Sequence, residues 1–155
     1  MRMTKGVEWA LHTLLNLDTV GGGPIGGATL AEAHGLPGPY LVKQLQQLTR
    51  AGLLASVPGP RGGFRLARPI SEITLLDVVE AIEGDALLFH CSEIRCGGRI
   101  GELAPPPAGP CPVKSAMRRA EEALREALAA QTLADVKADI DRDPAIGQAI
   151  RAAFD

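Results

Sequence analysis

Cysteine is scarce in this chain of 155 residues: it has three, and all of them lie between Phe89 and Lys114. An odd number of cysteines argues against a framework of disulfides and favours metal binding or redox chemistry. No apolar run is long enough to span a membrane. The stretch MRMTKGVEWA at the start has neither the apolar core nor the small-residue cleavage site of a signal peptide. We therefore expect a cytoplasmic protein.

The motifs of common enzyme classes are also missing. The sequence has no Gly-rich phosphate-binding loop, no nucleophile elbow and no zinc-protease motif. A thiol-based catalyst would need a base beside a cysteine, and only His90 adjoins one along the chain, at Cys91. A hydrophobic content of 46% is nevertheless that of a folded globular protein. These features favour a binding protein over an enzyme.

Acidic residues are absent from one long stretch, Ala33 to Ser71. That stretch holds five basic residues, which are Lys43, Arg50, Arg61, Arg65 and Arg68. The next stretch, Glu72 to Pro110, has seven acidic residues and two basic ones. Such local segregation, in a chain whose net charge is only −2, indicates an anionic partner, and nucleic acid is the first candidate. A solvated basic face is the alternative interpretation.

Apolar spacing in the first half predicts three helices, over about residues 4–17, 29–35 and 39–52. Thr29 and Glu32 have the spacing of a capping box at the start of the second helix, and Pro39 suits the first position of the third. The third helix has an inward stripe formed by Leu41, Leu45 and Leu48. Its opposite face is predicted to hold Tyr40, Lys43, Gln44 and Gln47.

Two β-prone runs follow, LLASV and FRLAR, and the Pro- and Gly-rich PGPRGG between them predicts a hairpin. A fourth helix is predicted over TLLDVVEAIEG, with Thr74 as its cap and Gly84 as its stop. We therefore predict a mainly α protein whose residues 1–84 form a winged helix-turn-helix DNA-binding domain with a small β-hairpin wing.

In a winged helix-turn-helix the third helix enters the major groove of DNA. Gln44 and Gln47 can pair with adenine, and Lys43 can bind guanine or phosphate. Arg61, at the tip of the wing, can reach the minor groove or the DNA backbone. We expect the DNA-binding residues to be Tyr40, Lys43, Gln44, Gln47, Arg50, Arg61 and Arg65.

The second half of the chain is predicted to form a cysteine-bearing loop at 85–111, a dimerisation helix within 112–136 and a C-terminal tail at 137–155. The long helix is predicted to run from Pro112 to about Gln131, and the tail after Pro144 to be weakly ordered. One apolar stripe of this helix comprises Val113, Ala116, Met117, Ala120, Leu124, Ala127 and Leu128. A small domain cannot cover so long a stripe, so we expect a homodimer joined through this helix.

The stretch from Tyr40 to Gly84 resembles the core of the Rrf/BadM family of bacterial transcription regulators. The wing sequence GPRGGFRLAR and the following ITLLDVVEAIEG carry the resemblance most specifically, and it extends from about Met3 to Val136. It implies a homodimer that binds a pseudo-palindromic operator. In many members, such as the IscR and NsrR types, it also implies an iron–sulfur cluster in the loop before the dimerisation helix.

The first helix offers two further donors, because Glu8 and His12 are four residues apart and project from the same face. The sequences GVEWALH, CSEIR and CPVKSAM resemble the RsrR type within the family. That resemblance implies a [2Fe-2S] cluster ligated by Glu8 and His12 of one subunit and by Cys91 and Cys111 of the other. Cys96 matches no ligand in this scheme.

Several alternatives stay open. One alternative is a three-cysteine [4Fe-4S] site in which Cys96 is a ligand and Glu8 is the fourth. The thiols also suit zinc with His90, simple packing in the core, or a cluster-free regulator that cysteine oxidation switches. The leading hypothesis is a dimeric DNA-binding regulator whose operator binding is controlled by an iron–sulfur cluster that senses redox, nitrosative or iron status.

Overall fold

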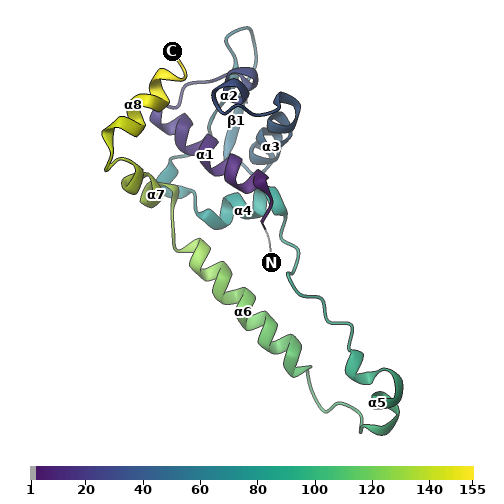
Figure 1. The fold of residues 1–155 in the computed structure, drawn as a ribbon. Helices are drawn as coiled ribbons and strands as arrows, with labels where there is room; N and C mark the ends of the chain where they lie inside the picture. The colour runs from purple at the N-terminus through teal and green to yellow at the C-terminus, as the bar shows by residue number, and fades with distance from the viewer. Residues whose placement is uncertain (1–2) are drawn as a thin grey trace.

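The computed structural model describes residues 3–155, which form helices and one β-hairpin (Figure 1). In chain order the elements are α1 (Lys5–Thr19), α2 (Gly27–Ala33), α3 (Gly38–Arg50), β1 (Leu54–Val57), β2 (Gly63–Leu66), η1 (Ile70–Glu72), α4 (Leu75–Glu83), η2 (Ile94–Cys96), α5 (Gly98–Leu103), α6 (Pro112–Ala129), α7 (Leu133–Ile140) and α8 (Pro144–Ala152). This architecture confirms the predicted fold class, mainly α with a winged helix-turn-helix.

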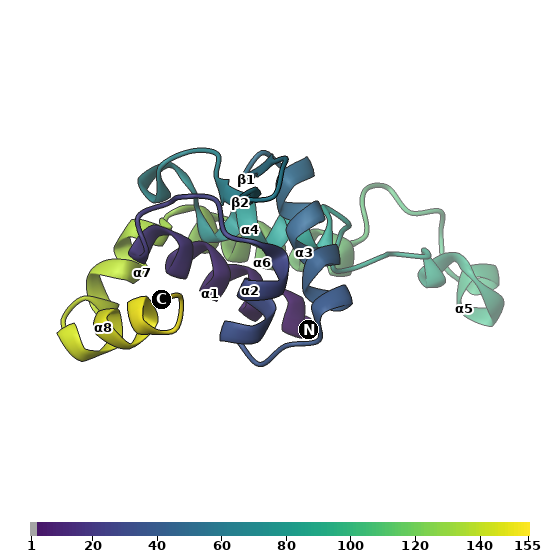
Figure 2. The same cartoon turned by 90° about the horizontal axis from the view of Figure 1, so that it is seen from above.

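The hydrophobic core lies where α1, α3 and α4 meet. Leu41, Leu45 and Leu48 of α3 are fully buried, as the apolar period predicts, and they join Leu14 of α1 and Val78 of α4. Each buried side chain of this size contributes about 1.5–3 kcal/mol to the free energy of unfolding. Seen from above, α1 lies between α7 and α8 on one side and α2 and α3 on the other (Figure 2). The first helix is therefore the centre of the domain.

The wing is an antiparallel hairpin in which Leu54 pairs with Leu66 and Val57 pairs with Gly63. The segment before α2 joins the wing through an isolated β-bridge, in which the backbones of Ile25 and Phe64 exchange two hydrogen bonds of 3.0 and 2.9 Å. Gly63 has a φ of 148°, and a Cβ at this position would collide with the carbonyl of Ile25. A glycine is therefore required where the wing meets the helical domain.

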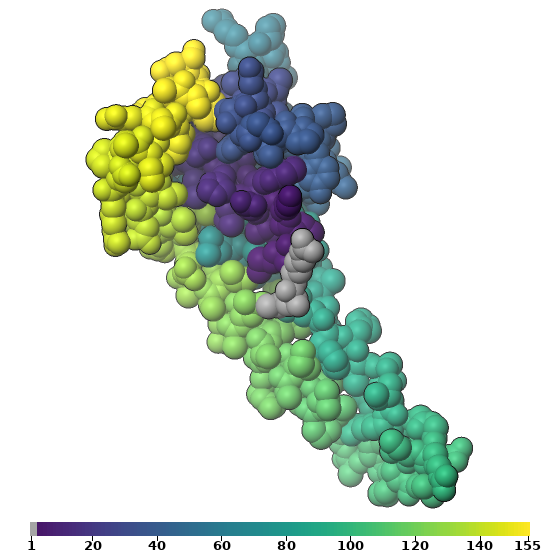
Figure 3. Space-filling view, viewed as in Figure 1, coloured from purple at the N-terminus to yellow at the C-terminus, as the bar shows by residue number. Residues whose placement is uncertain are grey.

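An arm formed by α6 and the cysteine-bearing loop projects from this domain (Figures 1 and 3). With 18 residues at about 1.5 Å each, α6 is about 27 Å long. The C-terminal part of α6 packs on α4, and the loop of residues 85–111 runs alongside α6. No helix within residues 3–155 is both long enough and apolar enough to cross a membrane.

Two local predictions, the cap of α2 and the order of the tail, are wrong. Gly26, not Thr29, is the N-cap of α2, and no side chain of a described residue caps this helix. The long helix predicted from Pro112 to about Gln131 is α6, which ends at Ala129, and a capping box of Thr132 and Asp135 starts α7 within the range 112–136. The tail after Pro144 is not weakly ordered. It forms α8, because Phe154 packs against the core cluster that α1 lines.

Candidate functional site

The exposed face of α3 is the first part of the site. Lys43, Gln46 and Arg50 are all exposed and lie at spacings of three and four residues, so they share one helical face. Tyr40, at the start of the helix, is 48% exposed. The face is positive and polar, and it points away from the leucine stripe. It has the chemistry needed to contact the edges of bases and phosphates.

Gln44 does not belong to this face, so its predicted exposure is wrong. It is 5% exposed, and its Oε1 has no hydrogen-bond partner among residues 3–155. The reason is helical geometry: Gln44 lies three residues after Leu41 and four before Leu48, which puts it on the buried side. Gln47 is half-buried, and its Nε2 donates a hydrogen bond of 3.4 Å to the carbonyl of Ile82. The residue that sequence reasoning missed is Gln46, which the spacing from Lys43 to Arg50 could have identified.

The wing supplies the second part of the candidate DNA interface. Arg61 is exposed in the turn between β1 and β2, and Arg65 is exposed on β2. Arg68 differs from them because it forms an ion pair of 3.2 Å with Asp77 of α4. The wing therefore presents two exposed guanidinium groups, while the third basic residue of this region links the wing to α4.

The cysteine-bearing loop brings three potential metal ligands together. Ligand atoms of Cys91, Glu93 and Cys111 all lie within 4.8 Å of one another. Cys111 is only 7% exposed, and Cys91 and Glu93 are half-buried. Cys96 is exposed and lies outside this group, as does His90. Sequence reasoning missed Glu93, although its position two residues after Cys91 was a signal.

Local structure explains why the two thiols meet. Cys111 is the N-cap residue of α6, and the backbone N–H groups of Lys114 and Val113 lower the pKa of its thiol. The Cys91 side chain and the positive charge of Arg95 lower that pKa further, against the opposing effect of desolvation. A helix N-terminus favours negative charge, so the thiolate of Cys111 is stabilised where a metal would need it.

Glu8 and His12 lie on α1, and both are exposed. They flank a shallow hollow that Met3, Val7 and Leu11 also line. Nearby, burial and the charge of His12 lower the pKa of His34. Cys111 lies at the start of α6, at the end of the arm that is far from α1 (Figures 1 and 2), and Cys91 lies beside Cys111. One chain therefore does not bring these two donors to its own cysteines.

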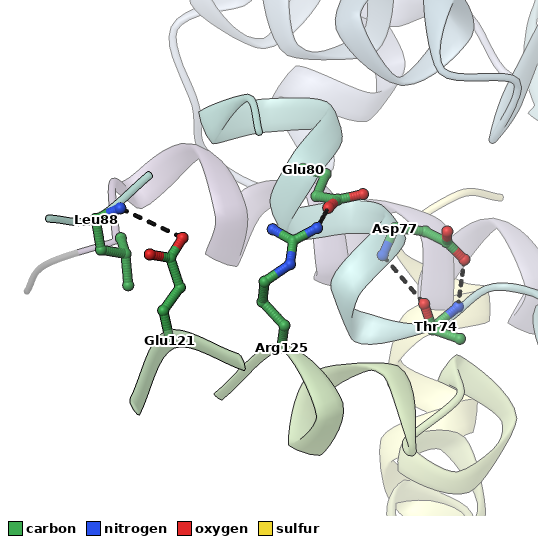
Figure 4. A network of polar contacts seen from close by, with 6 residues as sticks. All are labelled: Thr74, Asp77, Glu80, Leu88, Glu121 and Arg125. Atoms are coloured by element: carbon green, nitrogen blue, oxygen red, sulfur yellow. Dashed lines mark hydrogen bonds and ion pairs between the residues drawn. The ribbon is translucent and has the colours of Figure 1, made fainter. Parts of the chain in front are cut away.

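Polar contacts of α6 connect the cysteine-bearing loop with the DNA-binding domain (Figure 4). Glu121 is 8% exposed, and its Oε1 accepts a hydrogen bond of 3.4 Å from the backbone N–H of Leu88. One helical turn further on, Arg125 forms an ion pair with Glu80 of α4. The same helix thus contacts both the segment that leads to Cys91 and the helix that packs on α3.

The fold and the site together define a class: a winged-helix DNA-binding protein with a thiol-bearing arm. The comparison with known families gives the family. The Rrf2 family, described as iron-dependent transcriptional regulators, matches residues 3–139. The chain belongs to this family, which confirms the predicted family and the prediction that it is a regulator and not an enzyme.

Curated relatives cover most of the chain. It is 38% identical over 136 residues to Protein aau3 of Rhizobium meliloti. That match covers 88% of this chain and 84% of the relative. It is 36% identical over 138 residues to Rv1287 of Mycobacterium tuberculosis, a putative HTH-type transcriptional regulator, over 88% of this chain and 81% of the relative. These matches support a DNA-binding function for the whole chain.

Solved structures share the fold. IscR from T. potens superposes with a TM-score of 0.66 at 26% identity, covering 90% of this chain and 88% of that one. The oxidised form of CymR from Staphylococcus aureus superposes with a TM-score of 0.63 at 25% identity, covering 88% of this chain and 96% of that one. Both likenesses extend over most of this chain.

Proposed function

We propose that this protein is a homodimeric transcription regulator whose operator binding is controlled by an iron–sulfur cluster held between its two subunits. The observation that carries the proposal is the separation of the donors within one chain. The thiols of Cys91 and Cys111 converge at the end of the arm, while Glu8 and His12 are exposed on α1 of the domain. A second copy of the chain is needed to bring the two pairs together.

The DNA-binding surface is formed by α3 and the wing. Lys43, Gln46 and Arg50 would contact the major groove, with Tyr40 and the half-buried Gln47 at the edge of this face. Arg61 and Arg65 would contact the backbone or minor groove on either side. No acidic residue lies between Ala33 and Ser71, so this surface carries positive charge that attracts phosphate.

The homodimer is supported by a face of α6 that no other part of residues 3–155 covers. Val113, Ala116, Ala120, Ala123 and Ala127 are exposed and lie along one side of the helix. Leu124 and Leu128 instead turn toward α4, where they line a cavity of about 360 Å³ with Leu76 and Val79. Small side chains let two helices approach closely, so the alanine face suits a second copy of α6.

The donor set fits a [2Fe-2S] cluster. Iron–sulfur clusters are held by thiolates, and histidine can replace some of these ligands. Cys91 and Cys111 would supply the thiolates, and Glu8 and His12 of the other subunit would supply oxygen and nitrogen. Cys96 is exposed and lies outside the group of Cys91, Glu93 and Cys111, so it is not among the four proposed ligands. It stays the alternative ligand, for a [4Fe-4S] cluster.

The polar contacts of α6 give the signal a route to the DNA-binding surface. A bound cluster supplies one-electron redox chemistry, and the position of the cysteine-bearing loop then depends on its ligation. Two residues of α6 make the connection: Glu121 accepts a hydrogen bond from the backbone of Leu88 in this loop, and Arg125 forms an ion pair with Glu80 of α4. A shift of the loop along α6 is therefore passed to α4 and to α3, which packs on it.

A second candidate function is a cluster-free regulator that thiol oxidation switches. The ligand atoms of Cys91 and Cys111 are close enough that a small movement would bring the two sulfurs to disulfide distance. One structural relative, CymR of Staphylococcus aureus, was solved in an oxidised form. In this candidate an oxidant takes two electrons from the two thiols, the S–S bond forms, and two protons are released.

Purification without oxygen tests the proposal. The protein should be coloured, with iron and sulfide in equal amounts, and it should bind selected genomic duplexes with an affinity that changes when the cluster is removed. Cys96→Ala is the matched control and should keep the visible absorbance, whereas Cys91→Ala should lose it. A colourless protein whose DNA affinity responds only to thiol oxidants would favour the second candidate.

A further inference from the structure

We propose that the cysteine-bearing loop of a single chain is also a mononuclear site for a divalent cation of the zinc type, with Cys91, Glu93 and Cys111 as its ligands. This inference does not rest on the iron–sulfur proposal, because it uses no residue of a second subunit. It gives a role to Glu93, which has none in a cluster ligated by Glu8, His12, Cys91 and Cys111.

The spacing of the donors fits one ion. In tetrahedral zinc sites a thiolate sulfur lies about 2.3 Å and a carboxylate oxygen about 2.1 Å from the metal, so neighbouring donors are about 3.5–3.8 Å apart. The ligand atoms of the three residues already lie within 4.8 Å of one another without an ion. Rotation of one or two side chains closes the remaining difference. Three protein ligands leave the fourth position open for water.

The backbone and Arg95 hold these donors in place. Glu93 has a φ of 54°, which makes it the only non-glycine residue among those described with a positive φ. A residue with a side chain adopts this left-handed conformation only when its surroundings impose it. Arg95 holds the carboxylate of Glu93, because its Nε donates a hydrogen bond of 2.9 Å to Glu93 Oε2.

The same guanidinium closes the loop. Arg95 Nη2 donates a hydrogen bond of 2.8 Å to the carbonyl of Gly109, two residues before Cys111. Arg95 therefore ties the segment that carries Cys91 and Glu93 to the segment that leads to Cys111. A carboxylate that accepts from Arg95 through one oxygen can bind a metal through the other, and such outer partners orient metal ligands in many proteins.

Charge selects the kind of ion. Two thiolates and one carboxylate carry three negative charges, which a divalent cation and the guanidinium of Arg95 together neutralise. Two soft sulfur ligands favour Zn²⁺ over Mg²⁺ or Ca²⁺, which prefer oxygen. The place of Cys111 at the N-terminus of α6 favours the thiolate form that zinc requires.

The test is a metal titration of the full chain, stripped of metal and kept reduced without oxygen. Zn²⁺ is titrated against a chromophoric chelator, and Co²⁺ is used to count thiolates through its sulfur-to-metal charge-transfer absorbance. The wild-type chain should bind one ion with two thiolates. The double variant Glu8→Ala/His12→Ala and the control Cys96→Ala should bind equally well. Cys111→Ala should lose the site.

Two variants test the assigned roles of Glu93 and Arg95. Glu93→Gln keeps the size of the side chain and should weaken Zn²⁺ binding at least about tenfold while both thiolates still bind Co²⁺. Arg95→Ala should weaken it by about 10- to 100-fold, as the loss of an outer-shell partner does. Circular dichroism checks that each variant is folded.

The outcomes separate this proposal from the proposed function. Wild-type affinity in folded Glu93→Gln would overturn the assignment of Glu93. Loss of Zn²⁺ from Glu8→Ala/His12→Ala would show that the site needs the partner subunit and would overturn the single-chain site. A protein that never assembles a cluster but binds one Zn²⁺ per chain would support this inference and contradict the iron–sulfur proposal.

Discussion

Helix α3 has a buried side and an exposed side, and Gln44 lies on the buried one. The amide oxygen of Gln44 is buried without a partner, and a buried polar group in that state costs about 1–3 kcal/mol. We expect Gln44→Met, which has a similar shape and no polar atom, to raise the free energy of unfolding by about 1 kcal/mol in a denaturant titration. Gln46→Met, on the exposed face of the same helix, should change it by less than about 0.5 kcal/mol. A stability loss in Gln44→Met would show that the amide is satisfied.

Two exposed side chains should affect DNA binding in different ways. Gln46→Ala should change the preference among operators by about 1–3 kcal/mol, because a glutamine in the major groove reads base edges. Arg61→Ala should weaken binding on all sequences and reduce the slope of affinity against salt by about one counterion.

Binding isotherms at several salt concentrations check both predictions. Arg142→Ala is the control, because this residue is highly exposed on the turn after α7, away from the wing and α3. If the Gln46 and Arg61 variants behave like the Arg142 variant, α3 and the wing are not the DNA-binding surface.

For single residues, the sequence predicted burial and exposure well where residue type decides them. It predicted them poorly where the position of a residue around the helix axis decides them. The leucine stripe of α3 and the exposed Arg61 followed from the pattern. Gln44 was misplaced because glutamine is polar and was therefore assumed to be exposed. Glu93 was missed because a left-handed backbone and a hydrogen bond from Arg95, which no periodicity predicts, bring it beside the thiols.

Among the elements, α6 contacts both the cysteine-bearing loop and α4. The buried carboxylate of Glu121 holds the N–H of Leu88, and such a bond contributes about 0.5–1.5 kcal/mol. Glu121→Ala should therefore speed amide exchange in residues 85–91 by about two- to tenfold. Glu121→Gln keeps an acceptor and should leave exchange near the wild-type rate. Equal exchange rates in all three proteins would mean that α6 does not hold the loop.

The elements also show where sequence rules succeed. Thr74 caps α4 through a reciprocal capping box with Asp77, as the sequence indicates. The spacing of Thr29 and Glu32 indicates the same motif, but α2 has already begun at Gly27, so Thr29 lies inside the helix. Packing against the core decided the start of that helix, and local sequence could not reveal it.

For the whole molecule, the alanine face of α6 predicts dimerisation. Ala120→Glu puts a charge in the middle of this face, where an unpaired buried ion would cost about 3–5 kcal/mol in a dimer. Sedimentation should show a monomer that no longer binds its operator. Ala129→Glu is the matched control, since Ala129 is exposed on the opposite side of α6, and it should remain dimeric. A dimeric Ala120→Glu protein would place the interface elsewhere.

The most direct test of the account mixes two variants of the whole chain. One lacks Glu8 and His12, the other lacks Cys91 and Cys111, and neither alone should assemble a cluster. If the ligands come from opposite subunits, the purified heterodimer contains one complete donor set. Reconstitution without oxygen should then give one [2Fe-2S] cluster per heterodimer, half the content of the wild-type dimer. A heterodimer without iron and sulfide, beside a wild-type dimer that holds both, would contradict ligation across the two subunits.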